Sequence, residues 1–168
     1  MKKFRTVFTF LIVAVVFVLS GCMEEGKAWT DTDPSAMPVP TKASSIETVS
    51  IYSVNSDNMT LIPVSVRKEM QDPTPDYVAD LVMENLNEED IELTDITQKD
   101  NKVIVSFSSK GKPVKGCGSK METLILEAFA NSLLDNVEDC EKVIFRCDGK
   151  EYKSSQYSFG KNEVFASE

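Results

Sequence analysis

The side chains that could do chemistry in this chain are chiefly its four cysteines, because histidine is absent from all 168 residues. Histidine is the residue most often used for proton transfer near neutral pH, and it is the commonest metal ligand. Its absence excludes catalytic triads that depend on a histidine base. Aspartate and glutamate number 27, yet no spacing singles out a catalytic pair. The residue types therefore predict a protein that is not an enzyme and needs no metal or cofactor.

Cys22 differs from the other cysteines because a secretion signal precedes it. Basic residues come first, then an apolar run over residues 7–19, then the small residues Ser20 and Gly21. The run of about 13 residues is shorter than the roughly 20 that span a bilayer as a helix. The pattern resembles the lipobox of bacterial lipoproteins and predicts cleavage before Cys22 and lipid attachment to its thiol. The alternative is a plain secreted protein in which Cys22 is incidental.

The net charge bears on what holds the protein at a membrane. Cleavage of the signal leaves 15 basic against 27 acidic residues, a net charge of −12. Such a charge disfavours nucleic acid, which is bound largely by lysine and arginine, and it disfavours docking on anionic lipid. We therefore expect the acyl chains to provide the attachment, at the outer face of the cytoplasmic membrane.

The chain divides into three segments by composition. Residues 1–21 form the predicted lipoprotein signal peptide. Residues 22–45 are rich in threonine, serine, proline and acidic residues, which predicts an extended, disordered tether. Residues 46–168 carry the periodic apolar patterns of a folded domain. Their number is in the usual range for a single domain.

Alternating apolar residues predict a β-hairpin at the start of this domain, with strands near residues 49–53 and 61–66. Pro63 has no N–H to donate to a ladder, so we expect the second strand to lie at a sheet edge or to carry a bulge. Tyr52, in the first strand, is a candidate exposed aromatic for a partner contact. The alternative is that Tyr52 packs, half-buried, within its own sheet.

Two amphipathic helices are predicted further along the chain. Thr74 and Pro75 are typical of a helix start. The second helix, over residues 119–134, begins with Ser119 and Glu122 at the spacing of a capping box. Further strands are predicted at residues 92–98, 102–108, 143–147 and 151–153. The order β-β-α-β-β-α-β-β predicts an α+β fold, one domain with two helices packed on a mixed or antiparallel sheet.

Three cysteines remain in the domain, so a monomer holds at most one disulfide among them. The second helix rises about 1.5 Å per residue, and the strand over residues 142–147 returns at about 3.3 Å per residue. These lengths roughly cancel, which brings Cys147 back towards Cys117 and leaves Cys140 at the far end. We predict that any disulfide joins Cys117 to Cys147. The alternative is three reduced thiols.

Two charged loops are candidate ion sites. The acidic residues 88–90 could bind a hard cation, but they lack the alternating ligands and central glycine of an EF-hand. The glycine-rich, basic residues 109–118 could cradle an anion at the start of the second helix. They lack the ordered glycine-lysine-serine pattern of a P-loop. A solvated charge run and a mobile turn are the favoured interpretations.

A set of motifs extends through the domain from about Ile46 to Tyr157. The positions are Val49-Ser50-Ile51-Tyr52, Leu61-Ile62-Pro63-Val64 with Arg67, Val103 to Phe107, Glu122, Asn131-Ser132-Leu133, Val143 and Asp148-Gly149. This set resembles the GerM domain family, the sporulation and spore germination domain often found in lipoproteins of endospore-forming bacteria. The resemblance implies a non-enzymatic envelope module, similar to domains that build rings between the membranes of a developing spore.

Three classes of function are compatible with these patterns. The favoured one is an interaction or structural module that meets an envelope partner or a second copy, through an exposed strand edge. The second is a lipoprotein that binds a small ligand, which requires a pocket with convergent polar groups. An envelope hydrolase comes third, because the chain has no histidine.

Overall fold

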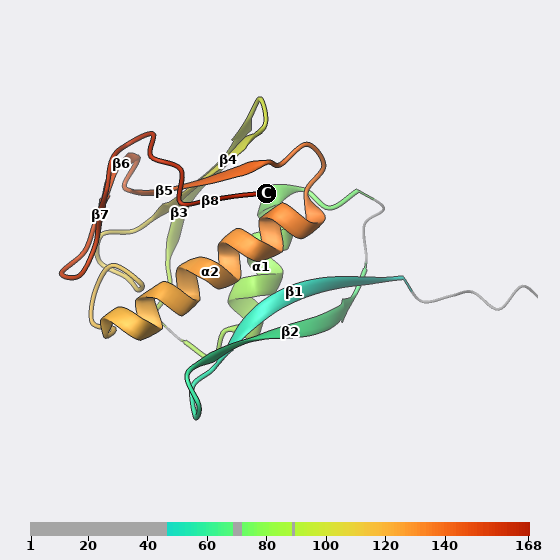
Figure 1. The fold of residues 1–168 in the computed structure, drawn as a ribbon, viewed down its shortest axis with the longest axis horizontal. Coiled ribbons are helices and arrows are strands. Elements are labelled where there is room, and N and C mark those ends of the chain that lie inside the picture. The colour runs from blue at the N-terminus through green and yellow to red at the C-terminus, as the bar shows by residue number, and fades with distance from the viewer. Residues whose placement is uncertain (1–46, 69–71, 89) are drawn as a thin grey trace, which may run out of the picture. The chain divides into compact units, whose positions relative to one another are not determined.

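The computed structural model describes residues 47–68, 72–88 and 90–168 (Figure 1). The predicted signal peptide and tether, including Cys22, lie outside these residues. The helices are α1 (Pro75–Asn85) and α2 (Ser119–Asn136), and the strands are β1 (Thr48–Asn55), β2 (Thr60–Arg67), β3 (Leu93–Lys99), β4 (Lys102–Phe107), β5 (Lys142–Cys147), β6 (Lys150–Lys153), β7 (Ser158–Phe159) and β8 (Ala166–Ser167). The predicted order of elements is confirmed, and two short strands follow it.

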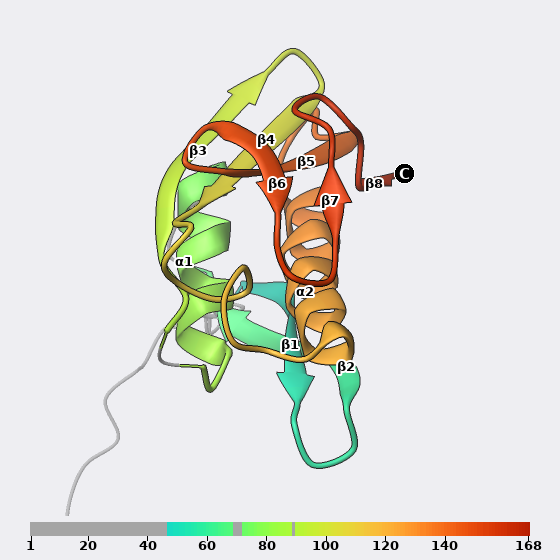
Figure 2. The same ribbon diagram turned by 90° about the vertical axis from the view of Figure 1, so that its left-hand side faces the viewer.

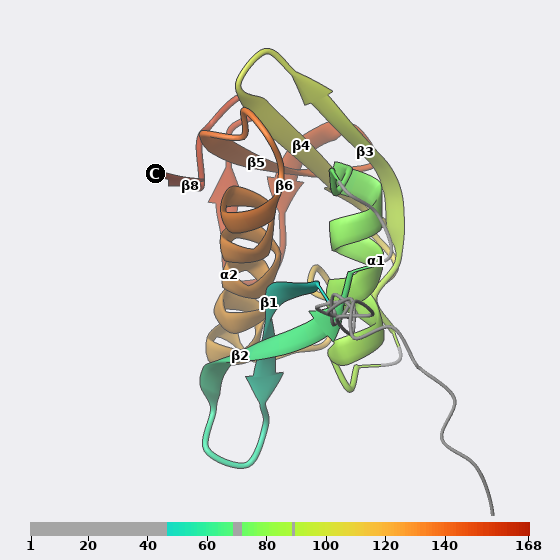
Figure 3. The same ribbon diagram turned by 90° about the vertical axis from the view of Figure 1, so that its right-hand side faces the viewer.

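The two helices lie between two sheets (Figure 1 and Figure 3). The small sheet is the β1–β2 hairpin, and the large sheet has the order β3-β4-β5-β6-β7, with β8 beside β5. The predicted α+β class is confirmed, with the strands divided between these sheets. The division of the strands into two sheets follows from the apolar surface of α2. This helix buries Leu124, Ile125, Leu126, Ala128, Phe129, Ala130 and Leu133. A helix that is apolar around most of its circumference needs neighbours on several sides.

Strands β4 and β5 form the parallel centre of the large sheet. A parallel connection needs a crossover of a dozen or more residues, which α2 supplies here. Val105 of β4 pairs with Phe145 of β5, and Phe107 pairs with Cys147. All four side chains are buried. The strand predicted at residues 102–108 is confirmed as β4, and it is buried at Ser106 as well as at Val105 and Phe107, as expected for the centre of a sheet.

Aromatic rings fill the core between the large sheet and α2. The Phe107 ring meets the Phe129 ring of α2 edge to face, with centroids 5.4 Å apart. Tyr152 of β6 is fully buried and stacks on Phe159 of β7, with centroids 5.3 Å apart. Figure 2 shows β6 and β7 extending alongside α2. The last strands thus close the core over this helix.

The predicted capping box at the start of α2 is wrong, whereas the predicted start of α1 is confirmed. The Thr74 hydroxyl accepts a hydrogen bond from the Tyr77 N–H at 3.4 Å. At α2 the N-cap residue is Gly118, and no side chain caps the helix. Glu122 is only 1% exposed and accepts a hydrogen bond from the Tyr152 hydroxyl instead. A tertiary contact has taken the side chain that the local pattern assigned to the cap.

Candidate interaction surface

The β1–β2 hairpin has one continuous antiparallel register, from Thr48 opposite Arg67 to Asn55 opposite Thr60. No other strand of the described residues pairs with β2. The predicted hairpin is therefore confirmed, and β2 is an edge strand without a bulge at Pro63.

Helix α2 covers the other edge of this sheet. The backbone N–H of Tyr52 donates to the Ser132 hydroxyl at 2.8 Å. The side-chain amide of Asn136 donates to the Ser50 carbonyl at 2.7 Å. The Ser132 hydroxyl also donates to the Ala128 carbonyl at 2.6 Å, so its hydrogen-bonding capacity is in use. Side chains of α2 thus occupy backbone groups of β1 that a further strand would otherwise bind.

These two contacts fix which backbone groups of β2 face outwards. In an antiparallel pair, opposite residues alternate between exchanging hydrogen bonds and pointing their N–H and C=O groups away from each other. Ser50 directs its C=O group to α2, and Tyr52 directs its N–H group there. Both residues therefore point their backbone groups away from β2. Their partners are Ser65 and Pro63. The backbone of Ser65 and of Pro63 therefore faces the open edge, and by the same alternation so does that of Arg67.

The open edge of β2 carries a single charged side chain, that of Arg67 at its end. Residues 60–66 contain no acidic or basic side chain, in a protein whose residues are 27% charged. Ile62 is 37% exposed, which makes it one of the exposed large apolar side chains of the described residues. Edge strands are commonly protected by lysine or proline. Pro63 supplies that protection at one position, and the rest of the edge can accept a strand.

Tyr52 is half-buried and packs against the core. A hydrogen bond to Asp135 of α2, together with the charge of that carboxylate, raises the pKa of the Tyr52 hydroxyl. The structure thus shows Tyr52 bound to α2 through both its backbone and its side chain. A partner contact by Tyr52 stays a prediction.

The two charged loops contact each other. The Lys112 backbone N–H donates to the Asp90 carbonyl at 2.7 Å, and the Lys112 ammonium forms an ion pair with Glu88 at 2.5 Å. The hydrogen bond to Glu88 raises the pKa of Lys112. A Cβ on Gly111 would lie 2.7 Å from the Asp90 carbonyl, so glycine is required for this approach. The charged groups of the two loops therefore bind each other, with Lys112 as the shared residue.

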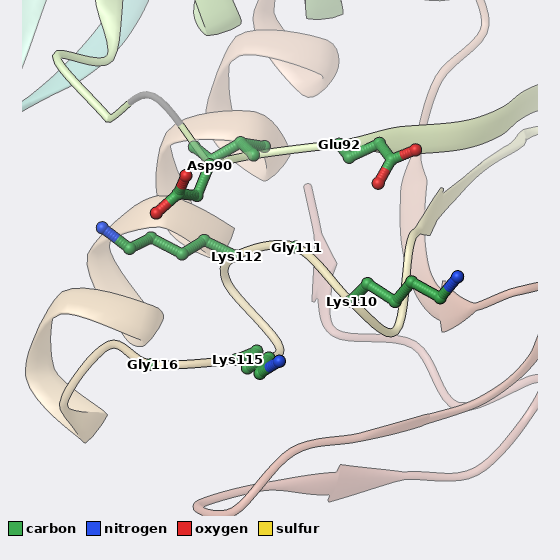
Figure 4. A pocket seen from close by; sticks show the side chains of 8 residues that line it. Asp90, Glu92, Lys110, Gly111, Lys112, Lys115 and Gly116 are labelled. Atoms are coloured by element: carbon green, nitrogen blue, oxygen red, sulfur yellow. The ribbon is translucent and has the colours of Figure 1, made fainter.

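An open hollow of about 700 Å³ lies beside this loop pair. Figure 4 shows the side chains of Asp90 and Lys112 extending in one direction and that of Lys110 in the opposite one. The lining is charged, unlike the mostly apolar pockets that bind small molecules. Within the described residues, no group of acidic or cysteine side chains is placed to hold a metal ion.

The three cysteines of the domain are thiols in this structure. Cys117 lies before α2, Cys147 ends β5, and Cys140 follows the far end of α2. Burial raises the pKa of each thiol, and the charge of Glu122 raises that of Cys117 and Cys147 further. The predicted Cys117–Cys147 bridge is not formed here, and their pairing on oxidation stays a prediction.

The contact between Glu122 and Tyr152 was missed by the sequence prediction. The Tyr152 hydroxyl donates to Glu122 Oε1 at 2.5 Å in the buried interior. Burial, followed by this hydrogen bond, raises the pKa of Tyr152 well above its ordinary value. A signal was present, because Glu122 stands at helical spacing from the buried Ile125 and Phe129. A glutamate on the apolar face of a helix indicates a buried partner.

Comparison with known proteins identifies the fold's family. The family model "Germane: Sporulation and spore germination" matches residues 30–153. Among solved structures, the tandem GerMN domains of the sporulation protein GerM from Bacillus subtilis match at 18% identity and a TM-score of 0.38, over 72% of this chain and 46% of that one. The chain thus spans less than half the length of that structure. No curated protein matches. The resemblance predicted from the sequence is confirmed, and this chain belongs to the Germane family of sporulation and spore germination domains.

Proposed function

We propose that this protein is a lipid-anchored, non-enzymatic interaction module of the bacterial cell envelope that acts in sporulation or germination. The family match supports the biological setting. The leader and Cys22 support the anchor. The role in interaction rests on the open edge of β2.

A non-enzymatic role is supported by the use that the fold makes of its reactive side chains. The Ser132 hydroxyl is bonded on both sides, by the Tyr52 N–H and the Ala128 carbonyl. The carboxyl of Glu122 is buried against Tyr152. The raised pKa of the three thiols lowers the fraction of thiolate, which is the nucleophilic form. These groups have packing roles that account for their presence.

The observation that carries the interaction role is the difference between the two edges of the small sheet. The β1 edge is covered by Ser132 and Asn136 of α2. The β2 edge presents backbone groups and, over residues 60–66, an uncharged surface that includes Ile62. An edge of this kind is a template for strand addition by a partner.

The anchor can be tested by metabolic labelling with an alkyne analogue of palmitate. The wild-type protein should carry the label, and the Cys22→Ala variant should lose it. Cys117→Ala is the matched control, because it removes a different cysteine and should keep the label. Label retained on Cys22→Ala would contradict lipid attachment at this residue.

The biological role can be tested in the host organism by deleting the gene and counting heat-resistant spores and their germination. The deletion should reduce one of these frequencies, and the wild-type gene should restore it. The Cys22→Ala gene should restore it less well, because the module would not be held at its membrane. Normal spore formation and germination in the deletion strain would contradict the proposal.

A further inference from the structure

We propose that the open edge of β2 pairs with the same edge of a second copy, antiparallel about a two-fold axis at Ser65. This inference rests on the proposed interaction role and names the partner. The result is a continuous four-stranded sheet in the order β1-β2-β2-β1, built from two hairpins.

The backbone pattern of β2 suits a reversed copy of itself. About an axis at Ser65, that residue faces its own counterpart, and Arg67 faces Pro63 of the other copy. The Ser65 N–H donates to the facing Ser65 carbonyl, and the Arg67 N–H donates to the facing Pro63 carbonyl. All of these groups point to the open edge, as the bonds of Ser50 and Tyr52 to α2 establish.

The end of β2 at Arg67 confines the pairing about this axis to residues 63–67, with Pro63 at the other limit. A strand laid along the whole edge would meet the missing N–H of Pro63 in the middle of its ladder. About the Ser65 axis the missing donor faces the Arg67 carbonyl instead, at the end of β2, where water can satisfy that carbonyl. In this pairing the proline therefore costs one donor at each end of the ladder and none at its centre.

Side chains across the junction are also compatible. Val64 stands opposite Val66 of the other copy, a pair of β-branched residues that stabilises adjacent strands. Ile62, which is 37% exposed, stands opposite Lys68, whose stem can cover it while its ammonium keeps Glu47 at 3.6 Å. Arg67 faces uncharged Pro63, so like charges are not placed opposite each other.

The position of α2 limits the assembly to two copies. In the four-stranded sheet both outer strands are β1, and each is covered by Ser132 and Asn136 of its own α2. No open edge remains in that sheet for a third copy. The same surface patch serves both subunits, as a closed two-fold interface requires.

Sedimentation equilibrium of the full-length protein, extracted from membranes into a density-matched detergent, measures the dimer. Ser65→Pro removes the central donors without touching the β1–β2 ladder, and it should weaken dimerisation at least about 30-fold. Ser65→Ala is the matched control, because it keeps the backbone N–H and should dimerise like the wild type.

Pro63→Ala gives a second test in the opposite direction. It adds a donor that faces the Arg67 carbonyl, once in each copy, and should tighten the dimer about 10- to 30-fold. This variant keeps the inference testable if Ser65→Pro disturbs the fold. Hydrogen exchange should show the Ser65 and Arg67 amides becoming protected as the protein concentration rises.

A protein that stays monomeric at all accessible concentrations would overturn the inference, as would a dimer that is insensitive to both proline substitutions. These outcomes are separable from failure of the proposed function. If an envelope partner protects the Ser65 and Arg67 amides of a monomer, the interaction role stands and the two-fold pairing is wrong.

Discussion

Helix α2 contacts its two sheets through different chemistry. In its first turns the carboxyl of Glu122 binds the Tyr152 hydroxyl of the large sheet, side chain to side chain, in the buried interior. In its last turns Ser132 and Asn136 bind backbone atoms of β1. A side-chain pair requires a specific residue on both elements, whereas a backbone contact requires one on the helix alone. The large-sheet contact is therefore the more sensitive to substitution.

The largest effect is expected when the large-sheet contact is broken. Tyr152→Phe keeps the buried ring but leaves the Glu122 carboxyl without its donor, and it should lower the free energy of unfolding by about 2–3 kcal/mol. Urea unfolding monitored by circular dichroism measures the loss. Tyr157→Phe is the control, because it also removes a hydroxyl bonded to α2, at Thr123, but from a half-buried site that water can reach, so its loss should be smaller. An equal loss in both variants would contradict a special role for the Glu122 contact.

The same tyrosine gives a pH dependence. Burial raises the pKa of Tyr152 above its ordinary value of 10.0. The unfolded chain therefore releases this proton at a lower pH than the folded protein, so stability is fully present below about pH 10 and falls above it. Tyr152→Phe should show a smaller fall between about pH 8 and pH 11. Parallel curves for the wild type and the variant would refute this.

The next effect concerns the small-sheet contact at Ser132. Ser132→Ala leaves the Tyr52 N–H without its acceptor and should cost about 1–2 kcal/mol. Ser119→Ala is the same substitution on an exposed position of α2 and should change stability by less than about 0.5 kcal/mol. If the two variants unfold at the same urea concentration, Ser132 does not hold the β1 edge.

A smaller effect is expected at Asn136, which is only half-buried. Asn136→Ala removes the donor to the Ser50 carbonyl and should cost about 0.5–1 kcal/mol, because water can reach this site. Asn131→Ala, on the same helix, should cost less, since its side chain makes no hydrogen bond within the described residues. The difference in thermal unfolding midpoint between the two variants measures the contact.

The smallest effect on stability is expected at the end of the hairpin where β1 begins and β2 ends, beyond the α2 contacts. Lys68 forms an ion pair with Glu47 at 3.6 Å, and Glu47 is 67% exposed. An exposed pair of this kind contributes little, so Glu47→Gln should cost less than about 0.5 kcal/mol at low salt. A loss above 1 kcal/mol would show that this end is held more firmly than the exposure of Glu47 indicates.

The sequence predicted those parts of the fold that depend on neighbouring residues. The hairpin around β1 and β2, the Thr74 cap and the edge position of Pro63 follow from short-range patterns and the chemistry of single residues. Each is specified within a few positions along the chain. Periodicity and turn chemistry are therefore sufficient to find them.

The contacts of α2 and of the charged loops could not be predicted in the same way. Ser119 and Glu122 have the spacing of a capping box, yet the partner of Glu122 lies 30 residues away in Tyr152. Lys112 and Glu88 are 24 residues apart and meet because the loops dock. Local patterns state what a side chain can bind, and the tertiary fold decides which available partner it meets.

The closure of both sides of β1 has a mechanical consequence. The chain enters the described domain at Glu47, and the next residue begins β1. Force applied along this strand from its N-terminal end loads the β2 ladder and the bonds from Ser132 and Asn136 together, in shear. These bonds must then fail as a group. The domain is therefore built to resist a pull that arrives through its own N-terminal segment.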